Sequence, residues 1–204
     1  MRRPQFIYFD LGNVLLHFDH PRSARQMAEV AGASFEQVWE AVFAGDTQAR
    51  YERGDIACDQ FHAEFSQRTN TTSELAALKY AAAAIFTPNE PVMKIVRHLH
   101  GAGVSLGILS NTCAAHWEYC LDGRYTVLND CFTHYALSYE LKSMKPDAAI
   151  YERAAALAGV APEMIFFIDD RPDNVAGALA AGYDAVVYES PEQLRGALQQ
   201  RGVL

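Results

Sequence analysis

Short apolar runs recur along this chain, and each is followed by a segment whose apolar residues have helical spacing. They are FIYF (6–9), VSLGIL (104–109), MIFFI (164–168), AVVY (185–188) and the weaker THYALS (133–138). Runs of this length between turn residues are typical of strands buried on both faces of a sheet. The alternation of strand and helix signals predicts an α/β fold with a doubly wound, mostly parallel, Rossmann-like sheet.

Start and stop signals mark three helices in the second half of the chain. Asp147 can cap a helix that stops at Gly159, and Pro172 can start a helix that stops at Gly182. Ser190, followed by proline, can start the last helix. Helices between strands supply the crossover connections that parallel strands need.

The strand signal disappears between residues 18 and 87, where about four helical segments follow one another. Within this stretch the segment YERGDI (51–56) reads as a turn. A long insertion after the first strand of such a sheet lies over the strand ends, where these folds bind ligands. We therefore predict a core domain of residues 1–17 and 88–204 and a helical cap domain of residues 18–87.

The net charge and the apolar runs limit which kinds of molecule the protein can bind. The chain has 204 residues and a formal net charge of -8, which argues against nucleic acid or an anionic membrane as partner because both attract basic patches. No run approaches the roughly 18 apolar residues of a membrane helix, and the apolar run after the first residues is too short for a signal peptide. The oligomeric state is left open by the sequence.

The four cysteines bear on the redox state of the cellular compartment in which the protein works. Cys58, Cys113, Cys120 and Cys131 form no Cys-x-x-Cys pair and have no histidine at zinc-ligand spacing. Reduced, packed thiols are typical of proteins in a reducing compartment. We therefore expect a cytoplasmic protein.

Polar residues gather after the predicted strands. They are Asp10 after the first run, Ser110 and Asn111 after the second, Asp169 and Asp170 after the third, and Lys145 just before a helix. The carboxyl ends of parallel strands share one edge of the sheet, so these distant residues are expected to converge on one crevice. Each residue alone also suits a turn or a helix start, so the prediction rests on their joint placement.

Such a set of residues has a definite chemistry. Packed carboxylates repel one another unless a cation lies among them, and their oxygen atoms suit Mg²⁺. A hydroxyl, an amide and free backbone N–H groups can hold an anion. Phosphoryl transfer needs positioning, charge neutralisation and an in-line nucleophile, and a carboxylate can be that nucleophile. The sequence therefore predicts phosphoryl transfer at this edge.

Four ordered segments, FDLGNV, ILSNT, SMKPDAAIY and FFIDDRPDN, resemble the signatures of the haloacid dehalogenase-like hydrolase superfamily. The DLGNV form resembles its bacterial branch of sugar-1-phosphate (α-D-glucose-1-phosphate) phosphatases, and the helical insertion resembles the first type of cap. The resemblance implies a site whose members have assigned roles. Asp10 would be the nucleophile, Ser110 and Asn111 the phosphate ligands, Lys145 the cation, and Asp10, Asp169, Asp170 and the Gly12 carbonyl the Mg²⁺ ligands.

Gly12 departs from the pattern of this superfamily, whose phosphatases usually carry a second Asp at that position. That acid protonates the leaving oxygen and then activates water, contributing about 10²–10⁴-fold. Three interpretations stay open: the chain uses substrates with good leaving groups, or His17, Asp19 or His20 replaces the acid, or the protein is weakly catalytic and serves for binding.

We therefore expect a Mg²⁺-dependent phosphatase that acts on a small phosphorylated metabolite, with a sugar phosphate as the expected substrate. A hydrolytic 2-haloacid dehalogenase is the alternative enzyme; it needs Asp10 but no metal. A non-catalytic protein that binds a phosphate ligand or another protein is the alternative from a different class. A phosphomutase is a fourth hypothesis, since the absence of a water-activating acid at Gly12 would suit it.

Overall fold

The computed structural model describes residues 2–204. Its core contains a five-stranded sheet in the order β5-β4-β1-β6-β7, and all neighbouring strands in it are parallel. The strands are β1 (Phe6–Phe9), β4 (Ser105–Ser110), β5 (His134–Leu137), β6 (Ile165–Asp169) and β7 (Asp184–Val187). All five predicted strands are present, and the predicted α/β fold with a parallel sheet is confirmed.

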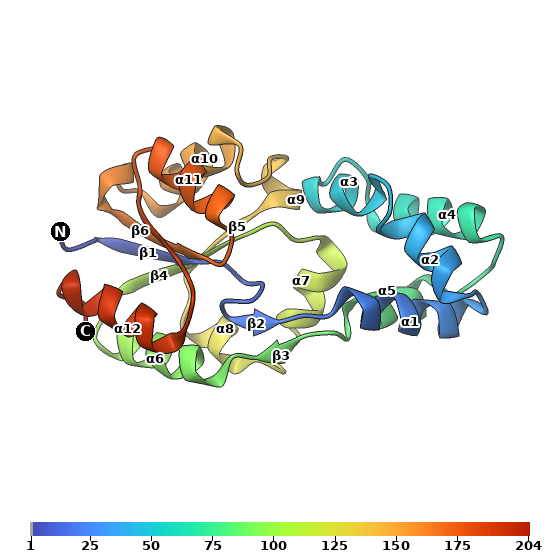
Figure 1. Cartoon of the computed structure of the whole chain (residues 1–204), viewed down its shortest axis with the longest axis horizontal. Coiled ribbons are helices and arrows are strands. Elements are labelled where there is room, and N and C mark those ends of the chain that lie inside the picture. Colours follow the sequence, from blue (N-terminus) through green and yellow to red (C-terminus); the bar gives the residue numbers. More distant parts are fainter. Residues whose placement is uncertain (1) are drawn as a thin grey trace.

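Helices cover both faces of this sheet (Figure 1). The helices α6, α8 and α12 pack on one face, while α10 and α11 pack on the other. The helical elements of this part are α6 (Glu90–Gly101), α7 (Ala114–Cys120), α8 (Thr126–Asp130), α9 (Ser138–Leu141), α10 (Ala148–Ala158), the 3-10 turn η1 (Pro162–Met164), α11 (Pro172–Ala180) and α12 (Pro191–Gln200). Asp147 precedes α10 as predicted, but its side chain makes no capping hydrogen bond.

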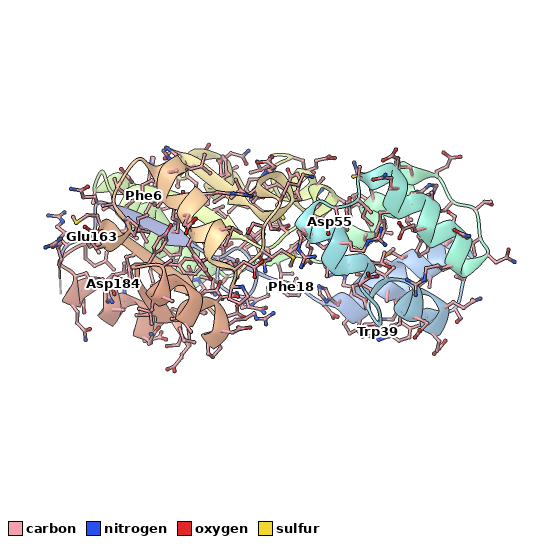
Figure 2. All side chains as sticks on the ribbon, turned by 90° about the horizontal axis from the view of Figure 1, so that it is seen from above. Phe6, Phe18, Trp39, Asp55, Glu163 and Asp184 are labelled. Carbon is pink, nitrogen blue, oxygen red and sulfur yellow. The ribbon has the colours of Figure 1, made fainter. Side chains whose placement is uncertain are left out.

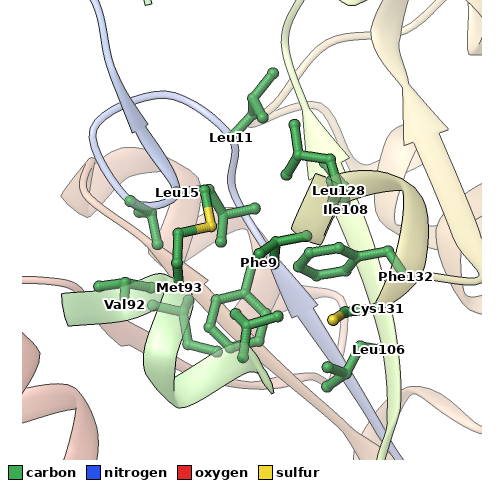
Figure 3. Close-up of a cluster of buried hydrophobic side chains, with 14 of the residues drawn as sticks. Phe9, Leu11, Leu15, Val92, Met93, Leu106, Ile108, Leu128, Cys131 and Phe132 are labelled. Atoms are coloured by element: carbon green, nitrogen blue, oxygen red, sulfur yellow. The ribbon is translucent and has the colours of Figure 1, made fainter. Parts of the chain in front are cut away.

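The side chains of β1 alternate between the two layers. Ile7 and Phe9 enter the cluster beneath α6 and α12, whereas Phe6 and Tyr8 enter the cluster beneath α10 and α11. Figure 3 shows the first cluster, with Phe9 at its centre. Burying each of these side chains contributes about 1.5–3 kcal/mol, so β1 is held firmly, and Asp10 follows directly where it leaves the sheet.

A second group of helices lies beside the sheet (Figure 1). It comprises α1 (His20–Ala31), α2 (Phe35–Val42), α3 (Thr47–Arg53), α4 (Cys58–Thr69) and α5 (Leu75–Ala83). These helices enclose their own buried cluster, and the short antiparallel pair β2 (Leu16–His17) and β3 (Thr87–Pro88) lies where the chain enters and leaves the group. The division into a cap of residues 18–87 and a core stays a prediction.

One element of this group differs from the prediction. Tyr51, Glu52 and Arg53 were expected in a turn but form the last turn of α3, and only the residues from Gly54 onward leave the helix. Gly54 ends α3 with a φ of 77° and donates its N–H to the carbonyls of Arg50 and Tyr51, as helix-ending glycines do. The insertion thus has five helices within the described residues, not about four.

The end of α3 is fastened to the core. The Ser138 hydroxyl of α9 donates to the Glu52 carbonyl, and Lys142 Nζ donates to the Gly54 carbonyl. The Ala115 N–H of α7 donates to the Tyr51 hydroxyl over 3.3 Å. Three contacts within four residues therefore fix the end of α3 against the core.

Gly54→Ala is expected to lower the free energy of unfolding by about 2–4 kcal/mol. An added Cβ would overlap the Tyr139 carbonyl oxygen, and the φ of +77° strains any L side chain. Gly101→Ala is the matched control, because nothing lies within 4 Å of its Cβ and no positive φ is involved. Urea unfolding measures both variants, and equal stabilities would contradict the role given to the α3–α9 contact.

No helix in residues 2–204 is long and apolar enough to cross a membrane. All four cysteines are free thiols; Cys58 is partly buried and the other three are buried.

Candidate active site

The carboxyl ends of the central strands bring the predicted site residues together. Asp10 follows β1, Ser110 ends β4 and Asp169 ends β6, and the parallel register of these strands places all three at one edge. Lys145 reaches the same edge from the segment between α9 and α10. The predicted convergence of these residues is therefore present in the structure.

Lys145 lies at the centre of the group. Its Nζ lies 2.9 Å from Asp10 Oδ1 and 2.6 Å from Asp169 Oδ2, and it also donates to the Leu109 carbonyl at 2.9 Å. Only 4% of Lys145 is exposed, and Asp169 is fully buried. Burial lowers the pKa of Lys145, but Asp10 and Asp169 outweigh that effect and hold the pKa above its ordinary value. Lys145 is therefore a charged ammonium inside the protein.

The two consecutive acids after β6 have different surroundings. Asp169 Oδ1 accepts hydrogen bonds from the Arg171 N–H and from Asn174 Nδ2, both at 2.9 Å. Asp170 is only partly buried, lines the pocket, and accepts a hydrogen bond of 3.0 Å from Asn13 Nδ2. Asp169 therefore organises the buried side of the site, while Asp170 faces the cavity.

Three carboxylates meet here at close range. One oxygen atom from each of Asp10, Asp169 and Asp170 lies within 4.8 Å of the other two. Burial first, and then the Asp169 and Asp170 charges, raise the pKa of Asp10 to about 7 against the opposing effect of Lys145. Three carboxylates against one ammonium leave a formal charge of -2, an arrangement that attracts a cation.

Ser110 and Asn111 lie beside this cluster. The Ser110 side chain is buried at the edge of a cavity. Asn111 Oδ1 accepts the Lys145 N–H at 2.8 Å, and its Nδ2 donates to the Lys145 carbonyl at 3.0 Å. The Asn111 amide therefore holds the main chain of Lys145, while its predicted contact with phosphate stays a prediction.

A pocket opens in front of these residues. It consists of two cavities of about 190 Å³ and about 40 Å³. Both cavities are lined by Gly12, Phe18, His20, Glu52 and Asn111. Asp10, Lys145 and Asp170 line the larger one, and Ser110 lines the smaller one. Residues of the sheet edge and of the inserted helices thus share one pocket.

Phe18 packs closely against Gly12. A Cβ added to Gly12 would lie 2.8 Å from Phe18 Cε1, closer than packed carbon atoms approach each other. Figure 2 shows Phe18 at the junction between the sheet and the inserted helices, with Trp39 and Asp55 farther into the helical part. The Phe18 ring therefore occupies the space that a larger side chain at position 12 would need.

The three residues predicted to replace an acid at position 12 have different locations. His17 is exposed on β2, and the Asp19 carboxylate caps α1 by accepting the Arg22 N–H at 2.9 Å. His20 lines both cavities and stacks on Phe43 with ring centres 5.0 Å apart. Among these three residues, only His20 lines the pocket.

Sequence reasoning missed Glu52. This residue lies on the last turn of α3 and lines both cavities. Its carboxylate accepts a hydrogen bond of 2.7 Å from Gln48 Nε2. Burial raises the pKa of Glu52 to about 7, although the Gln48 hydrogen bond and the charges of Arg171 and Lys145 lower it. The signal available in the sequence was a short helix with basic residues in its last turn, stopped by a glycine.

The fold and the site define an α/β protein with an acidic, lysine-centred site beneath inserted helices. Residues 5–182 match the model of the haloacid dehalogenase-like (HAD) hydrolase family. The chain therefore belongs to this family of hydrolase enzymes.

Two named relatives match most of the chain. A sesquiterpene phosphatase of Aspergillus oryzae is 25% identical over 175 residues, which cover 85% of this chain and 84% of the relative. A phosphatase of Mycobacterium tuberculosis is 26% identical over 197 residues, which cover 93% of this chain and 89% of the relative. Both relatives are named as phosphatases.

Solved structures share the fold. A HAD family enzyme of Bacteroides thetaiotaomicron, crystallised with magnesium and inorganic phosphate, has a TM-score of 0.77 at 24% identity; the match covers 90% of this chain and 93% of the other. L-2-haloacid dehalogenase of Xanthobacter autotrophicus has a TM-score of 0.64 at 21% identity, covering 98% and 83%. At these identities the likeness establishes the fold alone.

Proposed function

We propose that this chain is a Mg²⁺-dependent phosphatase that hydrolyses a small cytoplasmic phosphoester, a sugar phosphate, through an aspartyl-phosphate intermediate on Asp10. The observation that carries the proposal is the Asp10 carboxylate, held 2.9 Å from a buried ammonium at the wall of a pocket that Asp170 also lines. The two relatives named as phosphatases support the same reaction class.

The donor set fits a magnesium ion. Asp10, Asp169 and Asp170 supply hard oxygen atoms, and we propose the Gly12 carbonyl as a further ligand. Asn174 Oδ1 is buried without a hydrogen-bond partner in the described residues, and Asn174 lines the same cavity. Its Nδ2 binds Asp169, so an unused acceptor lies beside the acid cluster. A bound Mg²⁺ would supply charge neutralisation for the phosphate oxygens.

The chain's own residues would perform the rest of the reaction. An Asp10 oxygen would attack phosphorus in line, because Lys145 and Leu11 N–H hold Oδ1 at 2.9 and 2.7 Å and so fix the orientation of the carboxylate. Lys145 would offset charge that develops on the phosphate. Ser110 and Asn111 would bind the phosphate from the end of β4.

The pocket supports a small, hydroxylated substrate. Its larger cavity, about 190 Å³, falls below the roughly 300–1,000 Å³ of pockets that enclose drug-sized ligands. Glu52, His20 and Arg171 line this cavity and would offer polar groups to the substrate, and Phe18 would offer a ring face. A sesquiterpene phosphate, the class suggested by the name of one relative, is bulkier than this small cavity suits.

The acid cluster also bears on the alternatives. A dehalogenase attacks carbon and has no use for the -2 charge around Asp10, whereas a metal-dependent phosphatase requires a cation there. A non-catalytic protein would bind phosphate compounds without turnover.

A phosphoester screen with and without Mg²⁺ tests the proposed function. Phosphate release from sugar-1- and sugar-6-phosphates is expected with Mg²⁺ and is expected to fall to background with excess EDTA. Binding without turnover would favour the non-catalytic alternative. Release of halide from a 2-haloacid in EDTA, with no activity on phosphoesters, would establish the dehalogenase alternative instead.

A further inference from the structure

Glu52 is a pocket carboxyl to which the proposed phosphatase reaction has so far given no chemical step. It belongs to the inserted helices, yet it lines both cavities together with Gly12 and Asn111 of the sheet edge. Its nearest partner is neutral Gln48, at 2.7 Å. Glu52 is therefore not held in an ion pair, unlike the acids of the sheet edge.

The other two carboxyls that line the pocket have other proposed roles. Asp10 is paired with Lys145 and is the proposed nucleophile. Asp170 belongs to the acid cluster that suits a cation, and ligands of a cation must be deprotonated. Among the described residues that line the two cavities, Glu52 is the one carboxyl outside this cluster. It is thus the one acid there that is neither the proposed nucleophile nor part of the proposed cation site, and so is left for proton transfer.

The pocket histidines do not compete for this task. Burial lowers the pKa of His20, against a smaller opposite effect of Asp19. Burial, and then His20, lower the pKa of His116 to about 4. Both imidazoles are therefore neutral near pH 7 and hold no excess proton. Glu52, whose pKa lies near 7, can exist in both forms at that pH.

The position of Glu52 is fixed by its own main chain. Its carbonyl accepts the Ser138 hydroxyl, and the Gly54 carbonyl two residues later accepts Lys142 Nζ. The preceding residue, Tyr51, accepts the Ala115 N–H. These contacts tie Glu52 to the core at the wall of both cavities, and a proton-transfer group requires such a fixed position.

We propose that Glu52 is the catalytic acid and base of this enzyme, an inference that rests on the proposed phosphatase function. As an Asp10 oxygen bonds to phosphorus, the bond from phosphorus to the ester oxygen breaks, and the Glu52 proton passes to that oxygen. The alcohol leaves neutral. The Glu52 carboxylate then takes a proton from water as the water oxygen attacks phosphorus. The Asp10–phosphorus bond breaks, inorganic phosphate leaves, and Glu52 is again protonated.

Glu52→Gln tests this assignment with two substrates on one enzyme preparation. Glutamine keeps the size of the side chain and can still accept the Gln48 hydrogen bond, but it cannot donate a carboxyl proton. For an alkyl or sugar phosphate, kcat/KM is expected to fall about 10²–10⁴-fold. For p-nitrophenyl phosphate, whose leaving group needs no proton, it is expected to fall less than about tenfold. The ratio of the two losses is independent of any misfolded fraction.

Glu52→Gln is also expected to release a burst of nitrophenolate, about one per site, and then to turn over slowly. The reason is that this variant forms the aspartyl phosphate but lacks the base that activates water. Glu64→Gln is the matched control: Glu64 on α4 pairs with Arg50 of α3 at 2.9 Å and lines neither cavity. It is expected to change neither substrate's kcat/KM by more than about twofold.

The outcomes separate the two proposals. Equal losses of kcat/KM for both substrates, or no loss for either, would overturn the role of Glu52 and leave the phosphatase assignment standing. A wild-type enzyme that releases phosphate from neither substrate with Mg²⁺ would overturn the proposed function, and the inference with it.

Discussion

Asp10→Asn is expected to lower kcat for phosphoester hydrolysis by at least about 10⁴-fold while leaving the fold intact. An amide cannot form the aspartyl phosphate, yet it has the size of the carboxylate. The neighbouring strand β1 is buried in two apolar clusters that the substitution does not touch. Phosphate release measures the activity, mass spectrometry excludes deamidation back to aspartate, and thermal unfolding reports the fold.

Asp122→Asn provides the control for that experiment. Asp122 pairs with Arg124 at 2.7 Å on the surface and lines neither cavity of the pocket, so its loss is expected to leave kcat unchanged. Full activity of Asp10→Asn in a preparation free of aspartate would show that the nucleophile is another group.

Lys145→Met is expected to abolish activity and to lower the free energy of unfolding by about 3–5 kcal/mol. Methionine fills most of the volume of lysine, so the cost arises from two buried carboxylates, Asp10 and Asp169, that lose their common ammonium. Urea unfolding at pH 7 without Mg²⁺ measures the loss of stability.

Lys79→Met is the control that tests whether burial of the ion pair, and not the ion pair alone, causes the loss of stability in Lys145→Met. Lys79 Nζ lies 2.7 Å from Glu118, as close as Lys145 lies to its partners, but the Glu118 side chain is 60% exposed. Surface pairs contribute about 0–1 kcal/mol, so this variant should lose little stability. Similar losses in both lysine variants would mean that burial does not decide the strength of the Lys145 contacts.

Much of the sheet and of its acidic edge follows from local sequence signals. The apolar run at residues 6–9 coincides with β1, and the run at residues 164–168 differs from β6 by one residue at each end. Strands buried on both faces need continuous apolar runs, and parallel strands must bring their carboxyl ends together. Asp10 and Asp169 could therefore be assigned to one site before their contacts with Lys145 were known.

The helical side of the pocket could not be predicted in the same way. Glu52 faces the cavity because Ser138 and Lys142, more than eighty residues away in the chain, hold the end of α3. The packing of Phe18 on Gly12 is likewise a contact made in three dimensions. No local period encodes such contacts, and a short helix ending in glycine looks much like a turn.

The fastening of α3 to α9 has a consequence for the order of events in each catalytic cycle. The bonds that hold this helix end down lie on Glu52 itself and on Gly54. Any movement that lifts the helix end to exchange substrate for product would also withdraw the proposed proton shuttle from the nucleophile. The pocket would then exchange substrate and product only while Glu52 is away from Asp10, and the reaction would proceed only while the end of α3 is bound to the core.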